Sequence, residues 1–221
     1  IERAERLSKT GDKGKQKEIA LCGRLRDALG KGTPVRNLSF EAAEKEIIDD
    51  LHLLTDKKVL YVANVSEEVL KGKKAYVERL EDVAGKEGSE VVPICGDLES
   101  EIALLEEEER AEFLADLGLK ESGLEHLIHA GYRLLDLITF YTTAGPELRA
   151  WTVRRGTKAP EAAGKIHTDM EKGFIRAEVA AFEDFRSSGS LAAAKEKGLI
   201  RSEGREYVLQ DGDIVYFRFN V

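Results

Sequence analysis

The sequence predicts an α/β protein that begins with a helical hairpin and ends with a small β-grasp module. Apolar residues recur at helical spacing through residues 1–54, and two apolar runs flank a helix in residues 58–95. Residues 138–221 then alternate strands and helices in the order β-β-α-β-α-β-β. We therefore expect a helical arm over residues 1–55, an α/β segment over 56–137 and a β-grasp module over 138–221.

The first segment is predicted to form two helices joined by the Gly- and Pro-containing loop of residues 30–37. We expect Ser39 to cap the second helix and Glu41 to lie in its first turn. Narrow apolar stripes on otherwise charged helices fit an antiparallel, coiled-coil-like arm that projects from a body. Two ordinary surface helices fit the pattern equally well. The stripes consist of Cys22, Leu25 and Leu29, and of Phe40, Ala43, Ile47, Leu51 and Leu54.

The second segment has the pattern of a β-α-β unit. Residues 58–63 form an apolar run typical of a strand buried on both faces of a parallel sheet. A helix passing through Tyr76 and Leu80 leads to a second strand over 90–95, in which Pro93 indicates a sheet edge or a strand end. Two further helices are expected, over residues 98–117 and 124–137.

The third segment has short strands and helices separated by turn residues. A hairpin is expected to turn at residues 144–146, and two closing strands are expected on either side of the Asp211-Gly212 turn. The other expected elements are the hairpin strands 138–142 and 148–153, helix 160–166, strand 174–179, helix 191–197 and the final strand 214–219.

Charge is distributed unevenly along the chain. The 34 Lys and Arg against 42 Asp and Glu give a net charge of −8, which argues against a general nucleic-acid coat and against a DNA partner. From Ile138 onward, however, there are 13 basic and 12 acidic residues, against 21 and 30 before it. A surface that binds polyanions is therefore expected in the last third.

Two cysteines without CxxC spacing, Cys22 and Cys95, indicate a reduced, cytoplasmic protein. No signal peptide is visible, and no apolar run approaches the roughly 20 residues that a membrane span needs. Because the sequence begins at Ile1 inside a helical pattern, we expect further sequence upstream.

Two short motifs follow the two strands of the β-α-β unit. Asn64, Val65, Ser66 and Glu67 occupy the place where guanine-nucleotide switches carry Asn-Lys-x-Asp, at the carboxyl end of a strand where ligands bind. With Glu67 in place of Asp, guanine preference should weaken. Cys95-Gly96 ends the next strand, where Gly96 would allow a close approach to a base. The first motif also fits a strand-to-helix cap, and the second fits a simple turn.

The chain resembles the YchF/Obg-like ATPase family along essentially its whole length. Residues 54–67 (LTDKKVLYVANVSE) are similar to the family's base-recognition segment. Residues 155–169 (RGTKAPEAAGKIHTD), 172–178 (KGFIRAE) and 211–214 (DGDI) resemble its TGS domain. The resemblance implies that the chain contains part of the α/β sheet of a P-loop NTPase (G domain), a helical-hairpin arm and a C-terminal TGS domain. It also implies a protein that binds ATP in preference to GTP and acts at the ribosome. It also places Asn64, Val65, Ser66 and Glu67 at the adenine.

The chain departs from the family because it contains no Gly-x-x-x-x-Gly-Lys-Ser/Thr phosphate-binding loop. Neither Gly14-Lys15 nor Gly164-Lys165 has the required earlier Gly. We therefore expect no catalytic residue and no metal ligand here, with Mg²⁺ held by an N-terminal segment. This chain alone should be inactive, whereas its parent should hydrolyse ATP. The four histidines share no metal spacing, and surface or packing roles are expected for them: His52, His126, His129 and His167.

Basic residues near the predicted helix 160–166 are candidates for RNA contact: Arg154, Arg155, Lys158 and Lys165. Trp151 and Phe174 lie nearby in sequence, although a core position is favoured for Trp151. The expected partners are ATP and the ribosome, through its large subunit or through ribosomal or transfer RNA. A non-catalytic RNA-binding fragment and a GTP-binding translation regulator are the alternatives, and Glu67 argues against the regulator.

Overall fold

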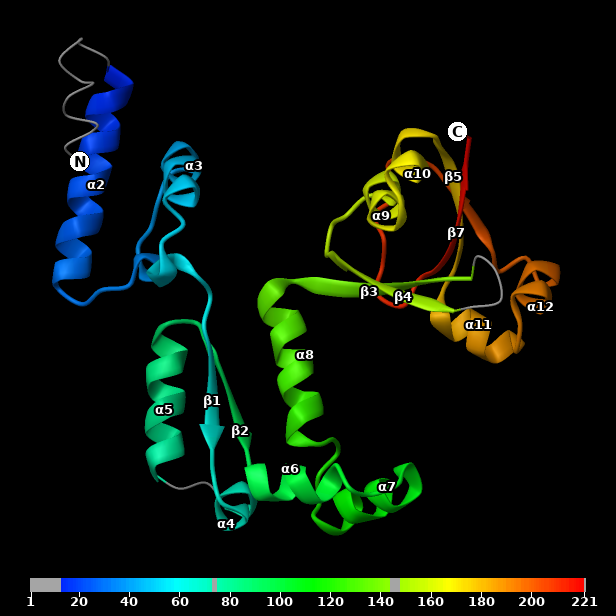
Figure 1. Cartoon of the computed structure of the whole chain (residues 1–221), viewed down its shortest axis with the longest axis horizontal. Coiled ribbons are helices and arrows are strands. Elements are labelled where there is room, and N and C mark those ends of the chain that lie inside the picture. Colours follow the sequence, from blue (N-terminus) through cyan, green and yellow to red (C-terminus); the bar gives the residue numbers. More distant parts are fainter. Residues whose placement is uncertain (1–12, 73–74, 144–147, 221) are drawn as a thin grey trace. The chain divides into compact units, whose positions relative to one another are not determined.

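The computed structural model describes residues 13–72, 75–143 and 148–220 (Figure 1). The chain divides into two compact units, Ile1–Leu127 and Ile128–Val221, each of which is described by itself. The predicted division into three segments stays a prediction.

The first unit begins with two helices that lie side by side, α2 (Lys13–Gly30) and α3 (Ala42–Leu51) (Figure 1). Two short 3₁₀ turns, η1 (Val35–Asn37) and η2 (Leu54–Asp56), accompany them. Residues 1–12 of the predicted hairpin lie outside the described residues, and a coiled-coil arm stays a prediction. A small apolar cluster holds the two helices together, made of Leu21, Leu25, Val35 and Ile48, with Leu38, Phe40, Ile47 and Leu53 packed against them.

The predicted Ser39 cap of the second helix is wrong, because α3 begins later. Glu41 is the N-cap and forms a capping box with Glu44, whose carboxylate accepts a hydrogen bond from the Glu41 N–H at 3.0 Å. The Ser39 carbonyl accepts from the Arg24 guanidinium instead, at 3.1 Å. Glu41 therefore precedes the first turn in which it was expected.

The predicted β-α-β order is confirmed, but the expectation that the first strand is buried on both faces is wrong, because Val62 is 50% exposed. Strands β1 (Leu60–Asn64) and β2 (Glu90–Ile94) pair in parallel, and helices α4 (Glu67–Lys71) and α5 (Ala75–Lys86) connect them. The core beneath them consists of Val65, Val69 and Val77, with Ala63 and Leu70 alongside.

A half-buried ion pair ties the N-terminal helices to this α/β part. The Arg36 guanidinium of η1 donates to the Glu87 carboxylate, which follows α5, at 3.0 Å. Tyr61 of β1 donates to the same carboxylate at 3.1 Å, and these donors lower the pKa of Glu87. The ion pair therefore joins segments that lie far apart in the sequence.

The single helix predicted over 98–117 is wrong, because two helices replace it. Helix α6 (Gly96–Ile102) ends before a turn, and α7 (Glu107–Asp116) begins at a second capping box, formed by Glu106 and Glu109. The helix predicted over 124–137 is present as α8 (Gly123–Leu135).

The C-terminal unit is a five-stranded mixed sheet with strand order β4-β3-β7-β5-β6. Strand β3 pairs in parallel with β7 at its centre, and the other neighbours are antiparallel. This order agrees with the predicted β-grasp arrangement, whereas the TGS assignment stays a prediction. The strands are β3 (Leu137–Thr142), β4 (Arg149–Arg154), β5 (Phe174–Ala180), β6 (Arg201–Glu203) and β7 (Ile214–Phe219), and the helices are α9 (Ala159–Ile166), α10 (Thr168–Lys172), α11 (Phe182–Ser188) and α12 (Leu191–Glu196).

The core of this unit lies between the sheet and α9. Three wholly buried alanines let α9 approach the strands closely, and Phe140 meets Phe217 edge to face with ring centroids 6.0 Å apart. The strand expected just before Asp211 is wrong. Those residues form only an isolated bridge between Lys158 and Val208, and the short β6 lies earlier in the sequence.

Candidate nucleotide-base and RNA-contact sites

The two loops predicted to recognise a base meet at one edge of the first unit. Because β1 and β2 are parallel, the loops that follow them lie at the same edge. The Asn64 side-chain oxygen accepts a hydrogen bond from the Gly96 N–H at 3.4 Å. The Val65 N–H donates to the Ile94 carbonyl at 2.8 Å. The fold therefore brings together residues that are about thirty positions apart in sequence.

At this edge, some residues can offer a ligand their side chains and others only their main-chain groups. Val65 and Cys95 are buried, so only their main-chain groups can face a ligand. Asn64, Ser66 and Glu67 are exposed. The Glu67 carboxylate forms an ion pair with Lys71 one helical turn later, at 2.6 Å.

Gly96 is exposed and begins α6. A side-chain carbon there would lie 3.6 Å from the Asn64 side-chain oxygen, which is an ordinary contact. The fold by itself does not require glycine at this position. The expected close approach to a base stays a prediction.

All four basic candidates of the C-terminal unit are exposed: Arg154, Arg155, Lys158 and Lys165. Two of them have acidic partners. The Arg155 guanidinium forms an ion pair with Asp136 at 3.3 Å, and the Lys158 ammonium with Glu206 at 2.6 Å. The second pair raises the pKa of Lys158 and lowers that of Glu206, chiefly through their hydrogen bond. This cluster therefore carries less unpaired positive charge than its sequence indicates.

The aromatic neighbours of the cluster belong to the core. Phe174 is buried, and Trp151 packs against the same core while its indole N–H donates to the Thr142 hydroxyl at 2.9 Å. The core position favoured for Trp151 is confirmed. The buried Phe174 ring is therefore not placed to stack on RNA bases.

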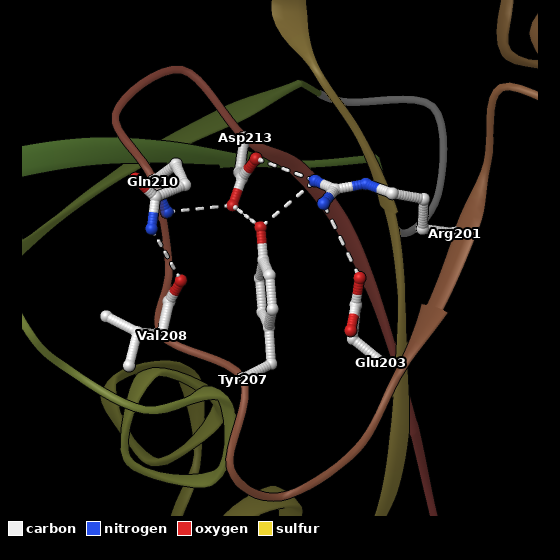
Figure 2. Close-up of polar contacts among 6 residues, drawn as sticks. All are labelled: Arg201, Glu203, Tyr207, Val208, Gln210 and Asp213. Carbon is white, nitrogen blue, oxygen red and sulfur yellow. Dashed lines mark hydrogen bonds and ion pairs between the residues drawn. The ribbon is translucent and has the colours of Figure 1, made fainter.

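A buried carboxylate that the sequence analysis missed, Asp213, accepts hydrogen bonds from the loop that contains Tyr207 and Gln210 (Figure 2). Asp213, only 3% exposed, accepts hydrogen bonds from the Tyr207 hydroxyl at 2.7 Å and from the Gln210 N–H at 2.9 Å. Arg201 donates to the Tyr207 hydroxyl at 3.1 Å and lies 3.9 Å from the Asp213 carboxylate. The Tyr207 carbonyl in turn accepts from the N–H that follows Lys158, at 2.8 Å. The only sequence signal was the Asp-Gly-Asp turn at residues 211–213.

Tyr207 supplies a test of this network at alkaline pH. Burial, followed by the hydrogen bond to Asp213, raises the pKa of Tyr207 to about 12. An unfolded Tyr titrates near 10, so its stabilising contribution should be complete below about pH 10 and lost by about pH 12. We expect the stability difference between wild type and Tyr207→Phe to shrink over that interval. Urea unfolding at a series of pH values measures it, and a difference that stays constant would contradict the assignment.

Among the described residues, no group of three or more His, Cys, Asp or Glu side chains could hold a metal ion. The described part of the chain also contains no helix long and apolar enough to cross a membrane. His126 faces Glu90 at 3.7 Å, and the His167 ring accepts a hydrogen bond from the Asp169 N–H at 3.2 Å.

Comparison with known proteins gives consistent matches. Residues 137–220 match the family model YchF-GTPase_C, described as a protein of unknown function (DUF933). The chain is 47% identical over 223 aligned residues to the ribosome-binding ATPase YchF of Bacillus subtilis (strain 168). It is 45% identical over 221 residues to the protein of the same name from Haemophilus influenzae. Both alignments cover 100% of this chain and 61% of the relative.

Solved structures agree with these matches. The Schizosaccharomyces pombe YchF GTPase superposes with a TM-score of 0.84 at 32% identity, covering 98% of this chain and 60% of that one. A GTP binding protein from Pyrococcus horikoshii OT3 gives a TM-score of 0.55 at 21% identity, over 81% and 49% of the two chains, which is a likeness in fold alone. The chain spans about three-fifths of the length of its curated relatives, as their C-terminal part. Over its whole length the chain therefore matches the C-terminal part of YchF proteins.

Proposed function

We propose that the whole protein is a cytoplasmic, ribosome-associated ATPase, and that this chain supplies its base-recognition edge and an RNA-contacting TGS domain. The meeting of the Asn64 and Gly96 loops at the carboxyl edge of two parallel strands carries the proposal. Relatives named ribosome-binding ATPase support both parts of it. The large ribosomal subunit is the contact that we propose.

The proposed preference for ATP follows from the residues at that edge. Recognition of guanine needs a short carboxylate that accepts from its N1–H and 2-amino groups. Glu67 is longer, and its carboxylate is already bound to Lys71 at 2.6 Å. Adenine instead offers a 6-amino donor, which a backbone carbonyl of this loop can accept. Asn64, Val65, Ser66, Glu67, Cys95 and Gly96 are the residues that we propose for contact with the base.

The phosphates and Mg²⁺ are proposed to bind elsewhere in the whole protein. The described residues offer no acidic cluster for a metal and no glycine-rich loop before a Lys-Ser or Lys-Thr pair. In this proposal the chain contributes base binding and contact with the ribosome, and we assign no catalytic step to it. A GTP-binding regulator is the second candidate, favoured by the name of the S. pombe relative.

Substitution of two residues, Val65 in the loop after β1 and Glu67 at the start of α4, tests the proposed contact with the base. In the whole protein, we expect Val65→Lys with Glu67→Asp to lower the ratio of ATP to GTP affinity roughly tenfold, because a charge-assisted hydrogen bond to guanine is gained. Calorimetric titration with both nucleotides measures the ratio.

Because Val65 is buried, the single variant Glu67→Asp is measured beside the double one, and thermal unfolding shows that each is folded. Glu68→Asp provides the matched control, since it makes the same chemical change one residue further along α4 and should leave the ratio unchanged. Folded loop variants with the wild-type ratio would refute the assignment of the base to this loop.

A further inference from the structure

The outer face of the C-terminal sheet carries a basic and aromatic surface that the sequence analysis did not identify. Antiparallel pairing places Arg176 opposite Arg218, and Glu178 opposite Tyr216. Residues directly opposite each other point to the same face of a sheet. The neighbouring Ala177 and the residue paired with it point into the core instead. We call Arg176, Glu178, Tyr216 and Arg218 together the arginine face.

The arginine face holds more positive than negative charge. Arg218 binds the Glu178 carboxylate with two nitrogens, at 3.1 and 3.3 Å, and Arg176 binds the same carboxylate at 3.2 Å. Two guanidinium groups therefore share one acidic partner. Lys195 of α12 is also exposed nearby, and the residues that the structure describes give it no ion pair. By contrast, Arg155 and Lys158 each have an acidic partner of their own.

An aromatic ring and a small groove lie beside these charges. The Arg218 guanidinium stands 4.4 Å from the centre of the Tyr216 ring, and Tyr216 is 38% exposed. The groove has a volume of about 290 Å³. That is below the range typical of sites for whole small molecules, and it suits one flat ring rather than a complete cofactor. Its apolar lining comes mainly from Leu191, Ile200 and Ile214, and Lys195, Tyr216 and Arg218 are among its polar lining.

Single-stranded RNA is the ligand whose chemistry matches this surface. Its phosphates need exposed cations, and its unpaired bases stack on aromatic rings and guanidinium planes. Double-stranded RNA hides its bases, and an acidic peptide makes no use of a groove that suits a planar ring. A purely structural role as a cross-strand ion pair accounts for Glu178 and Arg218, but not for the second arginine, the exposed ring and the groove together.

We propose that the arginine face binds a short single-stranded segment of RNA, with phosphates at Arg176, Arg218 and Lys195 and one base in the groove beside Tyr216. This site rests on the proposed association with the ribosome, and it names the chemistry of the contact. It lies on different residues from the cluster that includes Arg154 and Lys165.

Fluorescence anisotropy of this chain with a labelled oligouridine over a salt series tests the site. We expect Lys195→Gln or Arg176→Gln to reduce the salt slope by about 0.7 each, because one phosphate contact to a single strand is lost. Tyr216→Leu should weaken binding roughly fivefold or more through lost stacking, whereas Tyr216→Phe should preserve it. Lys197→Gln provides the matched control, since Lys197 is exposed at the end of α12 but does not line the groove.

Glu178→Gln separates binding from a structural role, because the two predict opposite signs. Removal of the shared carboxylate frees both guanidinium groups, so RNA affinity should rise although the ion pairs are lost. Circular dichroism shows whether each variant is folded. Folded variants that all bind oligouridine like wild type, or a chain that binds polyglutamate or duplex RNA in preference, would overturn the proposal.

Co-sedimentation with ribosomes distinguishes failure of this site from failure of the proposed function. If the whole protein sediments with ribosomes and the arginine-face variants do so equally well, the function stands and the site fails. In that case the triple variant Arg154→Gln, Arg155→Gln and Lys158→Gln becomes the next to measure. If the wild-type protein does not sediment, the proposed function fails, and oligouridine binding still decides the site.

Discussion

Asp213→Ala is expected to lower the free energy of unfolding of the C-terminal unit by about 3 kcal/mol. Asp213 is 3% exposed and accepts hydrogen bonds from the Tyr207 hydroxyl and the Gln210 N–H. Its removal leaves both donors without their acceptor, and it also removes the negative charge that lies 3.9 Å from Arg201. Urea unfolding followed by tryptophan fluorescence measures the change, because the single Trp of the chain, Trp151, packs against the core of this unit.

Asp211→Ala is the matched control for this measurement. Asp211 lies two residues earlier, is exposed, and accepts one hydrogen bond, from the Thr139 N–H at 2.8 Å. We expect its loss to cost only about 1 kcal/mol. If the two variants are equally stable, the buried network of Figure 2 does not stabilise the loop that contains Tyr207 and Gln210.

Elements with a clear periodicity could be predicted from the sequence with little error. The final strand was predicted over 214–219 and is found there, because alternating apolar residues give one face to the core. The meeting of the two loops at the proposed base-recognition edge could also be predicted. Once two strands of a parallel sheet are identified, the ends of both must lie at one edge, which brings Asn64 and Gly96 together.

Helix boundaries were harder to predict because side chains that cap a helix look like ordinary surface residues in sequence. A run of glutamates favours a continuous helix, yet Glu106 and Glu109 form a capping box that begins α7. Glu41 and Glu44 do the same at α3, which displaced the expected Ser39 cap.

Long-range pairing explains why the charge pattern was misread. The residues next to Lys158 in sequence predict an unpaired cation. In the fold, however, Lys158 pairs with Glu206, which lies 48 residues further along the chain. The arginine face could not be predicted from the sequence for the same reason. Arg176 and Arg218 lie more than forty residues apart, and only the register between β5 and β7 places them opposite each other. Local sequence carries no record of that register.

This chain alone is expected to hydrolyse no ATP, which is the largest difference we expect from the whole protein. Phosphoryl transfer depends on positioning the phosphates and neutralising their charge, so the phosphate-binding loop is indispensable. The pairs Gly14-Lys15 and Gly164-Lys165 are unsuited to that role because they lie within helices. Gly14 and Lys15 belong to α2, where Lys15 binds Glu18 at 2.6 Å. The second pair belongs to α9.

Gly164 shows what that second glycine does in the fold. A side-chain carbon at Gly164 would displace the flexible Glu171 carboxylate of α10 and would lie 3.2 Å from the Glu171 Cβ, so the glycine leaves room for that side chain. A carboxylate beside it also repels phosphate. The helical surroundings of both pairs therefore explain why neither can replace the missing loop.

The measurement compares phosphate release by the purified chain, by the whole protein and by buffer. Release from the chain should equal that of buffer, while the whole protein turns over. Titration should also show that the chain binds adenosine and ATP with similar affinity, because it offers a base edge without a phosphate cradle. Substantially tighter binding of ATP, or phosphate release that co-purifies with the chain through successive columns, would mean that residues of this chain contact the phosphates. The Asn64 edge would then no longer suffice to describe its nucleotide site.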